Sequence, residues 1–154
     1  MARAGSCALV CVVCNNKVYS ANAGDSLGLI ITKNSNKMGY VEVNRELNAN
    51  SAEERQRLKS LFPKEDDIVI CKRDNNTACY VKGRLQPTRS LGDLRLKHSE
   101  FNNPESLTPD HDYQSQLKTF SGPYITWEPE IKTFELTENY KALVLASDGL
   151  WDEL

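Results

Sequence analysis

The chain has 154 residues, of which 40% are hydrophobic and 26% are charged; these proportions and this length suit one soluble domain with its own core. The formal net charge of −2 gives no sign of a nucleic-acid-binding surface. No apolar stretch reaches the length of a transmembrane helix, and the first residues lack the pattern of a transit peptide. We therefore expect neither nucleic acid nor a membrane as a partner.

The first third of the chain has the alternation and turn chemistry of an antiparallel meander. Residues 6–13 are apolar on both faces, which predicts an inner strand of a two-sheet core. Asn15-Asn16 predicts a tight turn and 23–26 predicts another, whereas the polar stretch 32–39 predicts a loop. The strands expected between these segments are 17–22, 27–31 and 40–44.

The next segment predicts one helix and one hairpin. Ser51 and Glu54 have the spacing of a capping box, so we expect a helix that begins there and runs to about Leu61, where Phe62-Pro63 stops it. The hairpin is expected from strands 67–72 and 77–82, around a turn at 74–76.

Periodicity is lost between residues 97 and 123, where a long polar loop is expected. Both histidines, His98 and His111, lie in this segment, and we expect them to be solvated. Alternation returns at 131–136, and the apolar run 142–146 predicts a buried strand. Runs of strands with few helices predict the α+β class, with two packed sheets.

The chain has five cysteines, an odd number in apolar surroundings, which indicates reduced thiols and a cytoplasmic location, with a mitochondrial parent protein as the alternative. Cys11 and Cys14 have Cys-x-x-Cys spacing, but they fall on opposite faces of a strand and no second pair completes a metal site. Cys71 and Cys79 are symmetric about a predicted turn. We expect them to be cross-strand neighbours that stay free.

Two carboxylates close the chain at the end of the last predicted strand. Asp148-Gly149 breaks the apolar run, and Asp152 follows four residues later, so a helix here would place Asp148 and Asp152 on one side. Two close carboxylates repel unless a cation lies between them, and the cation that suits oxygen ligands is Mg²⁺ or Mn²⁺. The alternative is a plain strand-to-helix turn with Asp148 as the N-cap.

Three ordered motifs carry a family resemblance. The segment 146–152, Ala-Ser-Asp-Gly-Leu-Trp-Asp, resembles the Asp-Gly metal motif of the metal-dependent protein serine/threonine phosphatases of the PP2C or PPM type. Residues 22–26 resemble the Asn-x-Gly-Asp-Ser turn of that family, and 83–93 resemble its segment ending in Arg-x-Leu-Gly-Asp. The Gly-Arg-Leu-x-Pro form at 83–87 is nearest to the pyruvate dehydrogenase phosphatase branch.

The resemblance implies a β-sandwich of antiparallel sheets flanked by helices, incomplete at both ends, in one domain over 1–154 with a flap-like loop at 97–123. It implies metal-dependent hydrolysis of phosphoserine or phosphothreonine in protein substrates, without a covalent intermediate. By motif position, the metal residues are Asp148, Asp152, Asp25 and Gly149. Arg89 and Asp93 match positions near the flap, where a buried ion pair is expected.

The departures from the family pattern bear on activity. The Asp-Gly-His-Gly motif, whose aspartate bridges two metals in the family, is absent from the sequence, as are the phosphate-binding arginine before it and the C-terminal Asp-Asn motif. We therefore expect a central fragment of a phosphatase domain that is inactive by itself. The alternative is a non-catalytic, pseudophosphatase-like binding or regulatory module.

Overall fold

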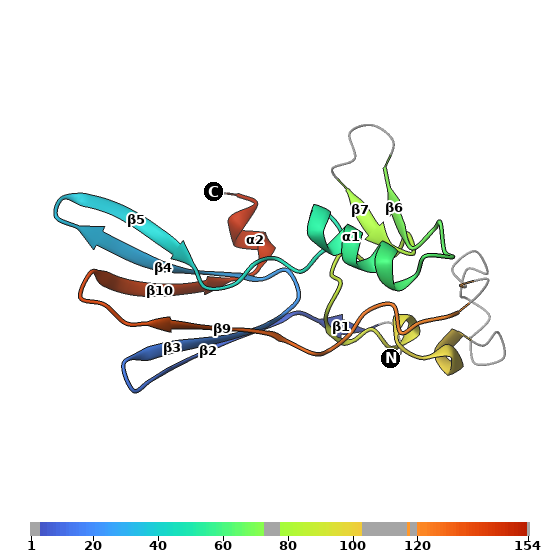
Figure 1. Ribbon diagram of the computed structural model, residues 1–154, viewed down its shortest axis with the longest axis horizontal. Helices are drawn as coiled ribbons and strands as arrows, with labels where there is room; N and C mark the ends of the chain where they lie inside the picture. The colour runs from blue at the N-terminus through green and yellow to red at the C-terminus, as the bar shows by residue number, and fades with distance from the viewer. Residues whose placement is uncertain (1–3, 73–77, 103–116, 118–119, 154) are drawn as a thin grey trace. The chain divides into compact units, whose positions relative to one another are not determined.

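The computed structural model describes residues 4–72, 78–102, 117 and 120–153 (Figure 1). The fold is α+β, with short helices and several antiparallel sheets, as predicted. The chain divides into two compact units. The sandwich unit comprises Cys7–Leu47 and Glu128–Leu154, and the mixed unit comprises Met1–Ser6 and Asn48–Trp127. Within the described residues, no helix combines the length and apolar character needed to cross a membrane.

The sandwich unit contains two three-stranded antiparallel sheets, drawn as two layers in Figure 1. The first sheet has the order β2-β3-β9, with β2 at Ala8–Cys14, β3 at Lys17–Ala23 and β9 at Glu130–Glu135. The second has the order β10-β4-β5, with β10 at Tyr140–Ala146, β4 at Leu27–Asn34 and β5 at Lys37–Glu42.

Alternate residues of the two sheets form one hydrophobic core. Val18 of β3, Ile30 of β4 and Val43 are at most 2% exposed, and Phe134 and Leu143 pack against them. Burying each such side chain contributes about 1.5–3 kcal/mol. This core between two antiparallel sheets confirms the predicted sandwich.

Two strand predictions are wrong about burial. Segment 6–13 was expected to be an inner strand, but β2 ends its sheet, and Val10 and Val12 are 57% and 53% exposed. The apolar run 142–146 was expected to be buried, but β10 also ends its sheet, and Leu145 is 41% exposed. The physical reason is the same for both strands. Each has one hydrogen-bonded neighbour within the described residues, so fewer side chains cover it than would cover an inner strand.

The loop predicted at 32–39 is instead a hairpin. Strands β4 and β5 pair as far as Asn34 with Lys37, and Ser35 takes a left-handed conformation with φ 54°. Thr32 is 7% exposed, and the other polar residues of the segment are exposed strand ends or turn residues rather than a long loop. The tight turn predicted at 15–16 is confirmed, since both asparagines have positive φ, as two-residue hairpin turns require.

The mixed unit is built around one helix and two short strand pairs. Its elements are β1 (Gly5–Ser6), α1 (Ala52–Leu61), β6 (Val69–Cys71), β7 (Cys79–Val81), β8 (Leu91–Gly92) and the 3₁₀ turns η1 (Leu94–Leu96) and η2 (Ser99–Asn102). Strand β6 pairs with β7, and β1 pairs with β8. The core of this unit includes Leu58, Ile68 and Val81, each at most 1% exposed.

Helix α1 confirms its predicted start and end. The Ser51 side chain accepts a hydrogen bond from the Glu54 N–H at 3.4 Å, and the helix ends at Leu61. In a capping box the Glu54 carboxylate would also accept from the Ser51 N–H, but that N–H donates to the Asn48 carbonyl oxygen instead. The Glu54 carboxylate is 1% exposed and accepts from Arg57 Nη2 at 2.7 Å and from Thr88 Oγ1 at 2.6 Å, so these side chains are its partners.

The predicted hairpin places Cys71 of β6 opposite Cys79 of β7, as expected. The expectation that they stay free is wrong, because the two form a disulfide. Cys11 is half-buried and Cys14 is exposed, and both are free, in agreement with their predicted placement on opposite strand faces.

The segment predicted as a loop at 97–123 is described in part: it includes the 3₁₀ turn η2, whereas residues 103–116, 118 and 119 lie outside the described residues. Lys97 is 4% exposed, and its ammonium group donates to the Ser90 carbonyl oxygen. His98 is exposed, as predicted, and His111 lies outside the described residues.

Candidate metal centre

The register of the second sheet brings two of the predicted site residues to the same end. Ala146, the last residue of β10, pairs antiparallel with Leu27, the first residue of β4. Asp148 follows Ala146 by two residues and Asp25 precedes Leu27 by two. Because antiparallel partners lie side by side, Asp25 and Asp148 leave the same end of the sheet. Helix α2 (Asp148–Trp151) begins there (Figure 1).

Helix α2 fixes the second carboxylate relative to the first. The Asp152 N–H donates to the Asp148 carbonyl oxygen at 2.8 Å, which closes one helical turn and confirms that Asp148 and Asp152 share a side. The Trp151 Nε1–H donates to the carbonyl oxygens of Leu27 and Ala146 at 3.0 and 3.1 Å. This one side chain ties the short helix to both strands of the pair.

The N-cap alternative for Asp148 is wrong in its detail. The N-cap residue is Ser147, and Asp148 is the first helical residue. The Asp148 Oδ1 accepts from the Gly149 N–H at 2.8 Å, which leaves Oδ2 for another partner. A carboxylate in the first turn is also stabilised by the helix dipole.

The turn that carries Asp25 depends on glycine. Gly24 has φ +137°, and a Cβ there would lie 2.4 Å from both Cβ and Sγ of Cys7. The Asn22 side chain donates to the Gly24 carbonyl oxygen at 2.9 Å. Asp25 is 9% exposed, and its Oδ1 accepts from the Cys7 thiol at 3.0 Å. The predicted turn at 23–26 is thereby confirmed.

Electrostatics show that the carboxylates share one negative region. Burial raises the pKa of the Cys7 thiol to about 12, together with its hydrogen bond to Asp25 and the charges of Asp25 and Asp148. Partial burial raises the pKa of Glu46, and the charges of Asp25, Asp152 and Asp148 raise it further. A carboxyl group whose pKa is raised by neighbouring carboxylates indicates a region of negative charge.

Cys7 and Glu46 are site neighbours that the sequence did not reveal. Cys7 was assigned to an apolar strand start, and Glu46 follows β5 in a segment without a motif. Neither position carries a local signal, because both contacts join residues that are distant in the sequence.

The donor chemistry of the region fits a hard divalent cation, since carboxylate oxygens are the ligands that Mg²⁺ and Mn²⁺ prefer. Within the described residues, however, no group of three or more His, Cys, Asp or Glu side chains is arranged to hold a metal ion. A Cβ on Gly149 would meet only Ser147 Oγ, at 3.6 Å, so the turn itself does not require glycine. The assignment of Asp25, Asp148, Asp152 and Gly149 as metal residues stays a prediction.

The third motif lies in the mixed unit. Gly92 has φ +75°, and a Cβ there would lie 2.4 Å from the Ala4 carbonyl oxygen, so glycine permits the β1–β8 pairing. The Asp93 carboxylate accepts from Ser90 Oγ at 2.6 Å. The expected ion pair with Arg89 is not among the described contacts of Asp93.

The whole chain, residues 1–154, matches the family model described as protein phosphatase 2C. The chain belongs to the protein phosphatase 2C family. It is 36% identical over 156 residues to "Probable protein phosphatase 2C 79" of Arabidopsis thaliana, across 100% of the chain and 39% of that relative. It is 37% identical over 155 residues to "Probable protein phosphatase 2C 43" of Oryza sativa subsp. japonica, across 100% of the chain and 38% of the relative.

Solved structures share the fold. A serine-threonine phosphatase 2C from Toxoplasma gondii superposes with a TM-score of 0.67 at 18% identity, over 99% of this chain and 44% of that one. A C. elegans sex determining protein gives 0.66 at 20% identity, over 97% of this chain and 28% of that one. The narrower resemblance to the pyruvate dehydrogenase phosphatase branch finds no support among these relatives.

Proposed function

We propose that the chain forms part of a Mg²⁺- or Mn²⁺-dependent hydrolase that removes phosphate from phosphoserine or phosphothreonine in proteins. Its contribution is the acidic region at one end of the second sheet, with Asp148, Asp152 and Asp25 as metal ligands beside Gly149. The observation that carries the proposal is the pairing of Ala146 with Leu27, which supports it because the motifs that contain Asp25 and Asp148 adjoin these two residues. Membership of the phosphatase family supplies the chemistry.

When bound, the metal ions of such sites activate a water and neutralise the developing charge on the phosphate. The residues of this chain position the carboxylates for that task. Trp151 holds α2 against β4 and β10, and the Cys7 thiol orients one oxygen of Asp25. A site on rigid elements keeps its geometry better than one on loops.

The chain by itself should hydrolyse phosphate esters poorly. The sequence contains no Asp-Gly-His-Gly motif, whose aspartate bridges the two metals in the family. Without a bridging carboxylate, no pair of metals can hold the water between them. The chain spans about 39% of the curated relative it matches, so the activity of a whole protein remains part of the proposal.

Hydrolysis of p-nitrophenyl phosphate with Mn²⁺ tests the expectation for the isolated chain. We expect no turnover above that of an EDTA-treated control. Turnover typical of an intact enzyme, abolished by EDTA, would show that the missing motif is not needed. The same assay on the full reading frame tests the enzyme itself, where Asp148→Asn should remove activity and the exposed Asp66→Asn should not.

The missing bridging motif also favours a second candidate, a non-catalytic module that uses the same scaffold to bind phosphorylated proteins or a regulatory partner. The full transcript separates the two. A flanking Asp-Gly-His-Gly sequence supports the enzyme, and its absence supports the binding module. For either candidate we propose one phosphatase-type domain over 1–154 and a flap-like segment at 97–123.

A further inference from the structure

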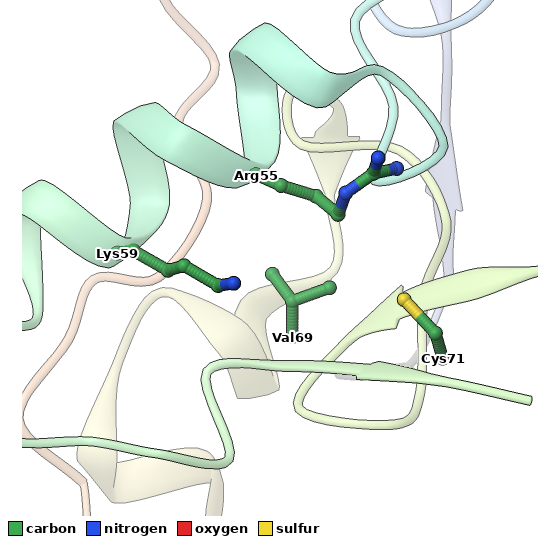
Figure 2. Close-up of a pocket in the computed structure, with 4 residues that line it drawn as sticks. All are labelled: Arg55, Lys59, Val69 and Cys71. Carbon is green, nitrogen blue, oxygen red and sulfur yellow. The ribbon is translucent and has the colours of Figure 1, made fainter. Parts of the chain in front are cut away.

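A small pocket lies in the mixed unit between α1 and β6, and none of its described lining residues belongs to the candidate metal centre. It encloses about 230 Å³ and is lined by Arg55 and Lys59 of the helix and by Val69 and Cys71 of the strand. Figure 2 shows all four side chains directed toward one space. Pockets for drug-sized ligands measure about 300–1,000 Å³, so this one suits a single chemical group.

Among the described residues, the pocket lining has two positively charged side chains and no negatively charged one. Arg55 and Lys59 are four residues apart on α1, and like charges at this spacing destabilise a helix slightly unless an anion offsets them. Two other cations of the unit are paired with carboxylates, since Arg57 pairs with Glu54 and Lys82 with Asp67. Within the described residues, neither Arg55 nor Lys59 forms an ion pair with a carboxylate.

Arg55 is held in place by the backbone rather than by an acid. Its Nη1 donates to the carbonyl oxygens of Ala49 and Asn50 at 3.1 and 2.6 Å and lies 3.9 Å from Cys79 Sγ. The other guanidinium N–H groups have no acceptor within the described residues. A guanidinium fixed in this way loses little freedom when it binds an oxyanion.

The opposite wall is uncharged and fixed. Cys71 is in a disulfide with Cys79, and a disulfide sulfur cannot ionise. The Cys79 N–H donates to Asn50 Oδ1 at 2.8 Å, so the segment that holds Arg55 is also tied to β7. Val69 packs against the core of the unit and gives the pocket an apolar side.

We propose that this pocket binds one tetrahedral oxyanion, a phosphate group, between the guanidinium of Arg55 and the ammonium of Lys59. Charge-assisted hydrogen bonds from arginine and the point charge of lysine are the usual means of phosphate recognition. The proposal does not depend on the phosphatase function, because none of the described lining residues is a proposed metal ligand and the proposal is for binding alone. The phosphate can come from free inorganic phosphate or from a phosphoserine side chain.

The test is a nuclear magnetic resonance titration of the 154-residue chain at low salt with EDTA present, so that no metal site competes. One arm uses inorganic phosphate and the other uses N-acetyl-phosphoserine amide. We expect at least one probe to shift the amide resonances of Arg55, Lys59 and Val69. A preference between the probes identifies the source, and absence of shifts there with both probes overturns the proposal.

Three variants make the test specific. Lys59→Gln should weaken binding about five- to tenfold, the size expected for losing one charge-assisted contact. Lys59→Arg should keep the affinity, and Lys64→Gln is the matched control, because Lys64 is exposed and does not line the pocket. Equal weakening by Lys59→Gln and Lys64→Gln would mean that only net charge matters and would overturn the site.

Discussion

Gly24→Ala should unfold the turn that presents Asp25. The new methyl group would lie 2.4 Å from Cβ and Sγ of Cys7 and 3.0 Å from its Cα, at a residue with φ +137°. That backbone region is almost exclusive to glycine and costs a non-glycine residue about 1–3 kcal/mol. Overpacking adds a cost of about 1–3 kcal/mol. We therefore expect a loss of about 2–6 kcal/mol in the free energy of unfolding.

The assay is urea unfolding followed by the fluorescence of Trp151, with the exposed Trp127 replaced by Phe in every variant. Cys7→Gly removes both atoms of the closest contact. A double-mutant cycle of Cys7→Gly with Gly24→Ala should therefore give an interaction free energy of about 1–3 kcal/mol, which is the cost of the steric clash. The cost of the positive φ at residue 24 should remain when Gly24→Ala is made in the Cys7→Gly background.

Gly149→Ala is the matched control. Its methyl group would meet only Ser147 Oγ at 3.6 Å, and alanine in a helix is neutral or stabilising by up to about 1 kcal/mol. If Gly24→Ala stays within about 0.5 kcal/mol of the wild type, the packing of Cys7 on Gly24 is not as described, and the argument for the position of Asp25 fails with it.

Two further predictions concern the mixed unit. Reduction of the Cys71–Cys79 disulfide, whose cysteines are 8 residues apart, should lower the free energy of unfolding by about 2–3 kcal/mol; urea unfolding with and without dithiothreitol measures this, and a Cys71→Ala/Cys79→Ala variant that still responds to reductant would contradict it. Burial raises the pKa of Glu65, but hydrogen bonds from Lys82, Ser121 and Tyr124 outweigh it and hold the pKa below 4.5. The stability that Glu65 contributes is therefore present above pH 4.5 and lost as pH falls through the lowered pKa. In Glu65→Gln the melting temperature should fall less steeply at acidic pH than in the wild type. An equally steep fall in both would refute the pairing of Glu65 with Lys82.

Local chemistry made much of the fold predictable. The asparagine turn at 15–16, the start of α1 at Ser51 and the opposition of Cys71 to Cys79 each depend on neighbours within a few residues. The four-residue spacing of Asp148 and Asp152 also predicted that they share a side, because one helical turn separates them.

The errors arose where sheet order decides the environment. An apolar run such as 142–146 is the same in an inner strand and in a strand at the end of a sheet, and only the pairing shows that Leu145 is 41% exposed. The contacts of Cys7 with Asp25 and of Glu54 with Thr88 join residues 18 and 34 positions apart. Periodicity and spacing report the faces of single elements, not which elements meet.

The measurement that tests the central claim most directly is calorimetric titration of the chain with Mn²⁺. Ligation by three carboxylates with waters in the remaining positions predicts weak binding, with a dissociation constant on the order of 10⁻³ M. Asp148→Asn should weaken it more than Asp25→Asn or Asp152→Asn, because Asp148 shares a sheet end with Asp25 and a helical turn with Asp152, while the control Asp66→Asn should bind like the wild type. Equal affinities for wild type and Asp148→Asn would contradict the metal assignment and leave Asp148 as a first-turn helix residue alone.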